Sequence, residues 1–154
     1  MRPLTRSDYD WVLALSAANE TETGHIDAAW LDAMAAQWLS ATVIENEAYL
    51  IVFGRDAKYG SRNFIWHRER DRDFAYVDRI VVAESARGKG LARLLYEDLF
   101  ETARARGAKS VVCEVNFDPP NPGSDAFHAR LSFAEVGRAT LANGKTVRYL
   151  KRQL

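Results

Sequence analysis

One strand–loop–helix unit in the middle of the sequence constrains the fold more than any other segment. Residues 74–83 (FAYVDRIVVA) combine β-branched and aromatic side chains in the way that strands do. After a short loop, residues 84–89, a helical apolar period begins at Gly90 and ends before Gly107. We expect the apolar face of this helix to consist of Leu91, Leu94, Leu95, Leu99 and Ala103. Because such a helix must bury its apolar face against a sheet, the unit predicts an α/β domain.

Size and composition narrow the class of protein further. The sequence has 154 residues, of which 47% are hydrophobic and 27% charged, as in an ordinary folded domain. Acidic and basic residues number 21 each, so the sequence lacks the excess of positive charge that would indicate a nucleic-acid partner. The single Cys113 excludes an internal disulfide and a cysteine-based zinc site. With no secretory leader and no long apolar run, we expect one cytoplasmic domain over residues 1–154, without metal or membrane contact.

Two helices are predicted in the N-terminal half. The first runs from the capping-box pattern of Thr5 and Asp8 to about residue 17, and the second covers residues 27–39. The polar residues 19–25 between them predict a loop. The expected inner-facing side chains are Trp11, Ala14, Leu15 and Ala18 in the first helix and Trp30, Met34 and Trp38 in the second.

The strand-like segments predict a mixed sheet. They are residues 41–45, 49–53, 74–83, 110–115, 134–136 and 146–151. A short helix over residues 124–131, capped by Ser124, precedes the last two strands, and the charged run 67–73 predicts a solvated segment. This order indicates an α/β fold with a mixed, mostly antiparallel central sheet and helices on both faces, not a doubly wound sheet.

The loop that opens the central helix has the composition of a phosphate site. It reads Arg87-Gly88-Lys89-Gly90-Leu91-Ala92, and two glycines at a helix N-terminus leave backbone N–H groups open to an anion. A tight strand-to-helix turn is the alternative reading. The spacing lacks the Gly-Lys-Ser/Thr ending of a nucleoside triphosphate loop and the third glycine of a dinucleotide fingerprint. The loop therefore predicts a phosphate-bearing cofactor held by backbone amides without magnesium.

Two motifs in register resemble the GNAT acetyltransferases. Arg87, Gly90 and Ala92, after the strand end Ile80-Val81-Val82, are similar to the acetyl-CoA signature of that family. Asn121, His128 and Phe133 follow at the spacing at which the family often carries Asn, Tyr and Phe. The stretches 77–82, 113–116 and 119–122 also resemble a set of predicted bacterial acetyltransferases that has no assigned substrate.

The resemblance implies a GNAT-like fold and a role for each matching residue. Backbone groups of Val81 and Val82 would hold the pantetheine arm and the acetyl carbonyl, and residues 87–92 would hold the pyrophosphate. The implied acetyl-CoA contacts are Ile80, Val81, Val82, Arg87, Gly88, Lys89, Gly90, Leu91, Ala92, Asn121, Ser124 and His128.

The candidate acid departs from the family pattern. His128 stands where the family commonly has a tyrosine that protonates the departing thiolate. A protonated imidazole would be the better acid, and turnover would then fall at high pH as the imidazole loses its proton. The alternative is that His128 only packs in a short helix. Ser132 replaces the family's glycine before Phe133, which we interpret as a tolerated change in a turn.

Two carboxylates are candidates for the base that deprotonates an acceptor amine. Asp78 is expected to point with Ile80 and Val82 by strand alternation, or else to pair with Arg79. Glu114, on the following strand, is slightly preferred, and a buried carboxylate there could also bind a cationic amine.

The predicted function is an acetyl-CoA-dependent N-acetyltransferase in which an amine attacks directly in a ternary complex. The acceptor is expected to be a small-molecule or peptide amine, and Cys113 is expected to be an inert core thiol. A non-catalytic CoA- or acyl-CoA-binding regulatory module is the alternative, and a longer acyl donor and a homodimer stay open. The loops expected to form the acceptor groove carry Asn19, Glu20, Glu22, Tyr59, Asn63 and Trp66.

Overall fold

A single mixed sheet runs through the computed structural model, which describes residues 1–154. Its strands are β1 (Arg2–Pro3), β2 (Trp38–Ile44), β3 (Ala48–Gly54), β4 (Phe74–Val82), β5 (Ser110–Asp118), β6 (Ala134–Thr140) and β7 (Thr146–Gln153). The helices are α1 (Tyr9–Ala17), α2 (Glu20–Thr23), α3 (Ala28–Met34), α4 (Arg62–Arg68), α5 (Leu91–Ala105) and α6 (Pro122–Arg130). Short 3-10 turns cover Arg6–Asp8, Ala35–Gln37 and Glu84–Ala86.

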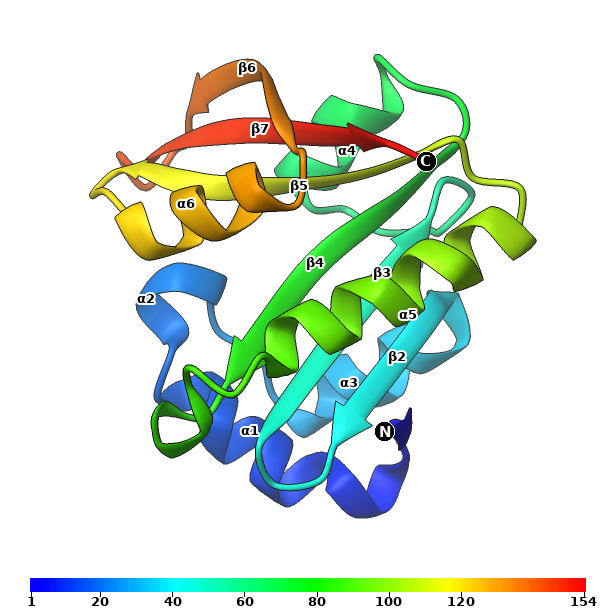
Figure 1. The fold of residues 1–154 in the computed structure, drawn as a ribbon, viewed down its shortest axis with the longest axis vertical. Coiled ribbons are helices and arrows are strands. Elements are labelled where there is room, and N and C mark those ends of the chain that lie inside the picture. The colour runs from blue at the N-terminus through cyan, green and yellow to red at the C-terminus, as the bar shows by residue number, and fades with distance from the viewer.

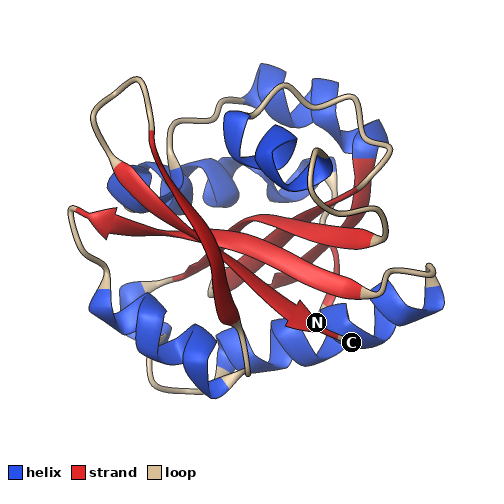
Figure 2. Cartoon of the chain, turned by 90° about the horizontal axis from the view of Figure 1, so that it is seen from above, coloured by secondary structure: helices blue, strands red, loops and turns tan.

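The strand order is β1-β2-β3-β4-β5-β7-β6, and every neighbouring pair except β4 and β5 is antiparallel. Helices cover both faces of this sheet (Figure 2). The predicted fold class, a mixed and mostly antiparallel sheet between helices, is therefore confirmed.

Each face of the sheet has its own apolar core. On one face α5 buries Leu95, Leu99 and Ala103 against β3, β4 and β5. On the other face α1, α3 and α4 pack against the opposite side of the same strands, around Val12, Leu31 and Phe64. The two cores follow from strand alternation, because successive residues of a strand point to opposite faces.

The two central strands separate along their length. β4 and β5 pair in parallel only where Phe74–Tyr76 meet Ser110–Val112, and beyond that point they diverge (Figure 1). The second half of β4 therefore has no strand partner on this edge. This unpaired edge carries Asp78 and Ile80, two of the residues predicted for the site.

Several predictions of helix faces and helix ends differ from the structure. The inner face of α5 is completed by Tyr96 and Phe100, while Leu94 is 49% exposed. Trp38 begins β2 because α3 ends at Met34 and one 3-10 turn follows it. Residues 19–25 include the short helix α2.

Two further predictions hold only in part, because tertiary packing overrides the local pattern. Trp11 and Leu15 pack against the core as predicted, and residues 68–70, 72 and 73 of the charged run are exposed as predicted. In α1 the buried residues are Tyr9, Val12 and Ser16, and Ser16 is tolerated there because its hydroxyl bonds the Tyr49 hydroxyl at 2.6 Å. In the charged run, His67 is buried and its Nε2 lies 3.2 Å from the Cys113 carbonyl.

Helix α6 begins two residues earlier than predicted. Its N-cap is Asn121, whose side-chain oxygen accepts from the Ser124 N–H at 3.2 Å, so Ser124 lies inside the first turn. Pro122 fits the first helical position because no intrahelical bond is needed there.

Beyond the end of α6, Ser132 has φ +63°, a left-handed conformation that favours glycine. We expect Ser132→Gly to raise the free energy of unfolding by on the order of 1 kcal/mol, because it relieves this strain. Denaturant unfolding of both proteins measures the difference. An unchanged or lower unfolding free energy would contradict the expectation.

Candidate active site

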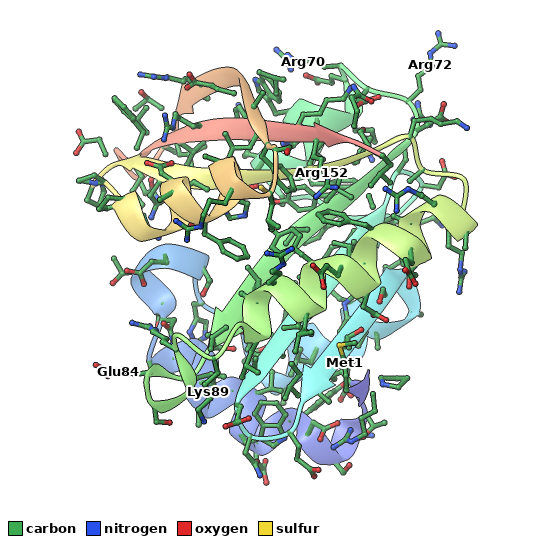
Figure 3. All side chains as sticks on the ribbon, in the orientation of Figure 1. Met1, Arg70, Arg72, Glu84, Lys89 and Arg152 are labelled. Atoms are coloured by element: carbon green, nitrogen blue, oxygen red, sulfur yellow. The ribbon has the colours of Figure 1, made fainter.

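Two adjoining pockets lie along the gap between the diverging strands. One, of about 220 Å³, is lined by β4, β5, α2, α6 and the β6–β7 turn. The other, of about 360 Å³, lies between the loop that precedes α5 and the outer side of α6. Lys89 and Glu84 mark this loop at the open end of the gap, far from the labelled Arg70 and Arg72 (Figure 3). The fold thus joins a glycine-rich loop to an internal pocket.

The loop pocket is built to receive an anion. Gly88 and Gly90 both have φ +79°, and a Cβ added at either would meet no atom within 4 Å, so their backbone is open to a ligand. Gly90 is the N-cap of α5 and has no side-chain cap, which leaves the first N–H groups of the helix without intrahelical partners. Arg130, from α6, also lines this pocket. These features fit the pyrophosphate of a coenzyme.

The two basic residues of the loop contact the protein itself. The Arg87 guanidinium donates to the Asn19 side chain at 3.1 Å, and Lys89 pairs with Glu47 at 2.8 Å. The positive charge that lines the pocket therefore comes from Arg87, Arg93 and Arg130, and Lys89 is not among the lining residues.

The residues predicted for the site divide between the two pockets. The internal pocket is lined by Asp78, Ile80, Glu114, Asn121, Ser124 and His128. The loop pocket is lined by Val82, Arg87, Gly88, Gly90, Leu91 and Ala92. Val81 lines neither pocket, because its side chain is buried in the core beneath α1 and α3. The two pockets share no lining residue, and the contacts expected with acetyl-CoA stay predictions.

The internal pocket passes through the sheet. Tyr96 of α5 and His128 of α6 line it from one face. Asn63 of α4, Glu22 and Thr23 of α2 and the Gly24 that follows α2 line it from the other face. This passage exists because β4 and β5 have separated at that level. Two substrates can therefore meet in it from opposite faces of the sheet.

A register shift changes the expected direction of Asp78. Ile51 pairs with Arg79 and Val52 with Val77, so Asp78 is the extra residue of a β-bulge. Ile80 packs toward the α5 core, whereas Asp78 accepts a hydrogen bond from the Tyr59 hydroxyl at 2.6 Å on the other face. The prediction that Asp78 points with Ile80 is therefore wrong.

The alternative reading of Asp78 is confirmed. The Arg79 Nε donates to the second carboxylate oxygen at 2.7 Å, and both side chains of this ion pair are 5% exposed. Each oxygen of Asp78 thus already accepts a strong hydrogen bond. Such a carboxylate is poorly suited to take a proton from a substrate.

Glu114 has the opposite arrangement. Its Oε1 accepts hydrogen bonds from Asn63 Nδ2 at 3.0 Å and from the Tyr76 hydroxyl at 2.9 Å. Its Oε2 is buried and has no hydrogen-bond partner. Burial, together with the nearby charge of Asp78, raises the pKa of Glu114 to about 8. One oxygen is therefore held in place while the other is free to accept a proton.

His128 is a neutral, fully bonded imidazole. Its Nδ1 lies 2.8 Å from the Ser124 carbonyl, which can only accept, so Nδ1 carries the proton. Its Nε2 then accepts from the Tyr96 hydroxyl at 2.7 Å. Burial lowers the pKa of His128, so the protonated imidazole expected from the sequence is disfavoured at neutral pH.

The cysteine is a core residue. Cys113 is buried, and burial raises the pKa of its thiol well above the ordinary value. The thiol is therefore protonated and a poor nucleophile, as its position in an apolar strand indicated.

The sequence alone did not indicate three residues of this region as parts of the catalytic site. Tyr96 lies within the apolar repeat of α5, where its position predicts only packing. Arg130 lies at the exposed end of α6, where a charged residue gives no sign of a function. Asn63 was expected to face an acceptor groove, but it bonds Glu114. The aromatic residues near it in the sequence were the available signal, because Phe64 packs on Tyr59 and Trp66 stacks on Tyr149, which bonds Asn63.

Comparison with known proteins identifies the family. The model of the acetyltransferase (GNAT) family matches residues 14–133, most of the chain. The chain belongs to the GNAT acetyltransferase family. It is accordingly an acyltransferase, and the family supports acetyl-CoA as its donor. No curated protein matches the chain.

Solved structures share the fold of this GNAT domain over its whole length. Ard1 from Thermoplasma volcanium has a TM-score of 0.78 at 15% identity, over 99% of this chain and 95% of that one. The NatC complex bound to Gag peptide and CoA gives 0.75 at 16% identity, over 99% and 96%. The structure of yncA from Salmonella typhimurium with its cofactor acetyl-CoA has a TM-score of 0.67 at 18% identity, over 99% of this chain and 92% of that one.

Two findings describe the rest of this GNAT protein. No helix in it is both long enough and apolar enough to span a membrane. No group of three or more His, Cys, Asp or Glu side chains is arranged to hold a metal ion.

Proposed function

We propose that this protein is an acetyl-CoA-dependent N-acetyltransferase whose acceptor is a primary amine, which attacks directly in a ternary complex. The observation that carries the proposal is the pocket that crosses the sheet between β4 and β5. The glycine-rich loop opens on the α5 and α6 face, and the free oxygen of Glu114 belongs to the other. A coenzyme thioester and an amine entering from opposite faces would meet between the strands.

Glu114 is the proposed general base. An ammonium group must lose a proton before it can attack a thioester, and a carboxylate with a pKa near 8 matches that task at neutral pH. Its buried, unpartnered Oε2 is a suitable acceptor for that proton. Asp78 would then act through its negative charge, which helps to raise the pKa of Glu114.

The Tyr96–His128 pair is the proposed proton source for the departing thiolate. Acetyl-CoA supplies the activated acetyl group when it is bound. The Tyr96 hydroxyl is the donor in its hydrogen bond to His128, and both residues line the pocket. The acid role expected for His128 thus passes to Tyr96. Its O–H proton, held by His128 Nε2 at rest, would transfer to the departing thiolate, and the phenolate left behind would regain a proton from solvent before the next turnover.

We expect Tyr96→Phe and His128→Phe each to lower turnover by about 10²-fold, because each breaks the same proton-donating unit. The double variant is expected to be no slower than either single variant, since residues that act as one unit are not additive. Steady-state kinetics of the four proteins measures this. Wild-type turnover in both single variants would mean that water supplies the proton.

The acceptor and the alternative function are tested together. Purified protein is incubated with acetyl-CoA and a panel of amino acids, polyamines, aminoglycosides and peptides with free N-termini, and free thiol is measured. An enzyme releases thiol with at least one acceptor class, whereas a regulatory module binds acetyl-CoA without release.

We further propose a cytoplasmic location for the protein. A measurement of its molecular size in solution distinguishes a monomer from a homodimer.

A further inference from the structure

A chain of hydrogen bonds connects β7 to the proposed base. The Tyr149 hydroxyl donates to Asn63 Oδ1 at 2.9 Å, and Asn63 Nδ2 donates to Glu114 Oε1 at 3.0 Å. The three residues come from β7, α4 and β5, which are far apart in the sequence. Their contact is therefore a product of the fold.

Tyr149 fixes which way the Asn63 amide faces. A phenol that donates to Oδ1 leaves the amide N–H group turned toward Glu114. The reverse orientation would bring an amide oxygen against a carboxylate oxygen and leave the phenol without an acceptor. The amide is thus held as a donor to the carboxylate.

Packing keeps Tyr149 in place. The Trp66 ring stacks on Tyr149 with centroids 4.0 Å apart and planes 15° from parallel. The six-membered ring of this indole lies close to Gly137 of β6, which pairs with Tyr149, and a Cβ added at Gly137 would come within 2.4 Å of it. The absence of a side chain at Gly137 gives Trp66 the space to stack.

The arrangement determines which oxygen of Glu114 is available. Asn63 and Tyr76 both donate to Oε1, so the side chain cannot rotate freely and Oε2 remains unpartnered. Without Asn63, only the Tyr76 hydroxyl would distinguish the two oxygens.

We propose that Asn63 is a positioning residue for the acetyl transfer, because its hydrogen bond holds Oε1 of Glu114, leaves Oε2 unpartnered and stabilises the ionised carboxylate. The inference rests on the proposed function, in which Glu114 is the base. It adds that the base is controlled from α4 and β7, through the Asn63–Tyr149 contact.

Other charged and titratable groups surround Glu114 and stay unchanged in Asn63→Leu. Those that interact with its carboxylate are Tyr59 from the β3–α4 loop, Tyr76, Asp78 and Arg79 from β4, Tyr96 from α5, Cys113 from β5 and Tyr149 from β7. Three more line the same pocket, namely Glu22 from α2, His128 from α6 and Lys145 from the β6–β7 turn.

Asn63→Leu removes the amide donor at nearly constant volume. The hydrogen bond from Asn63 lowers the pKa of Glu114, so its loss should move that pKa upward. We expect the acid limb of the kcat/KM profile to move up by about one pH unit, which lowers kcat/KM about tenfold at pH 7 and much less at pH 9. Tyr149→Phe should give a smaller shift in the same direction, and the exposed Arg68→Leu in the same helix should give none.

Carbon-13 NMR of labelled glutamate carboxyl groups separates this inference from the proposed function. A Glu114 resonance that titrates at higher pH in Asn63→Leu and in Tyr149→Phe supports the positioning role. If that resonance moves while the kcat/KM profile does not, Glu114 is not the base and the proposed mechanism fails, although the positioning of its side chain stands. An unchanged Glu114 titration in both variants overturns the inference.

Discussion

Glu114→Gln is expected to lower kcat by about 10²- to 10⁴-fold, because the amide cannot accept the proton that the acceptor amine must lose. Acetyl-CoA affinity should change little, since the loop pocket does not include Glu114. An assay of thiol release over time measures kcat, and calorimetric titration with acetyl-CoA measures the affinity. Asp78→Asn is the matched comparison, because Asp78 is a neighbouring carboxylate whose oxygens are already occupied.

The relative effects of these two variants decide which carboxylate is the base. We expect the larger loss of kcat in Glu114→Gln and a smaller loss in Asp78→Asn, which perturbs an ion pair near the site. Full activity in Glu114→Gln together with a strong loss in Asp78→Asn would reverse the assignment.

The pH dependence of the wild type follows from the same carboxylate. Because Glu114 acts only when it is ionised, activity should rise as the pH passes through about 8. The pKa of Glu114 is about 8 in the folded protein and 4.5 in the unfolded chain. Between these pH values the folded protein keeps a proton on Glu114 that the unfolded chain has released. The contribution of Glu114 to the free energy of unfolding therefore falls as the pH rises from 4.5 to 8. Glu114→Gln should therefore have a higher melting temperature than the wild type at pH 9. Its residual activity should not rise as the pH passes through 8. A wild-type rate independent of pH between 6 and 9 would count against a base of this kind.

Gly90→Asp is the second change with a large expected effect. An aspartate at this position places a side chain and a negative charge where the backbone N–H groups are open, so acetyl-CoA affinity should fall at least about 100-fold. Calorimetry of the folded variant measures the loss.

Gly107→Asp provides the control for backbone strain. Gly107 has φ +85° at the other end of the same helix, and a Cβ there would also meet open space. Both variants therefore carry a similar conformational cost, and only Gly90→Asp should weaken binding. Equal acetyl-CoA affinity in the two variants would contradict the proposal that this loop binds the pyrophosphate.

The features that the sequence predicted well depend on local geometry. The strand, the glycine-rich turn and α5 follow from residue type and period, because a left-handed glycine and a helix N-terminus are determined within a few residues. The same holds for the neighbouring strands β2 and β3, which the sequence predicted from their β-branched and aromatic residues. The residues that the sequence predicted for the site line two pockets, and their roles stay predictions.

Simple periodicity failed where one element depends on a distant neighbour. Tyr96 lies beside apolar residues in the α5 repeat, and only its contact with His128 from α6 shows a polar role. His67 belongs to a charged run, and its burial depends on β5 and β7 packing over α4.

The sequence by itself determined the family fold, and it indicated the glycine-rich loop as the candidate coenzyme site and two carboxylates as candidates for the base. Only the tertiary structure shows how the two carboxylates differ. A bulge opposite Ile51 and Val52 turns Asp78 toward Tyr59 and Arg79, whereas Asn63 and Tyr76 hold one oxygen of Glu114 and leave the other without a partner. The reason is physical: a carboxylate's ability to accept a proton depends on burial and on hydrogen bonds from other strands and helices, and these do not exist until the chain has folded.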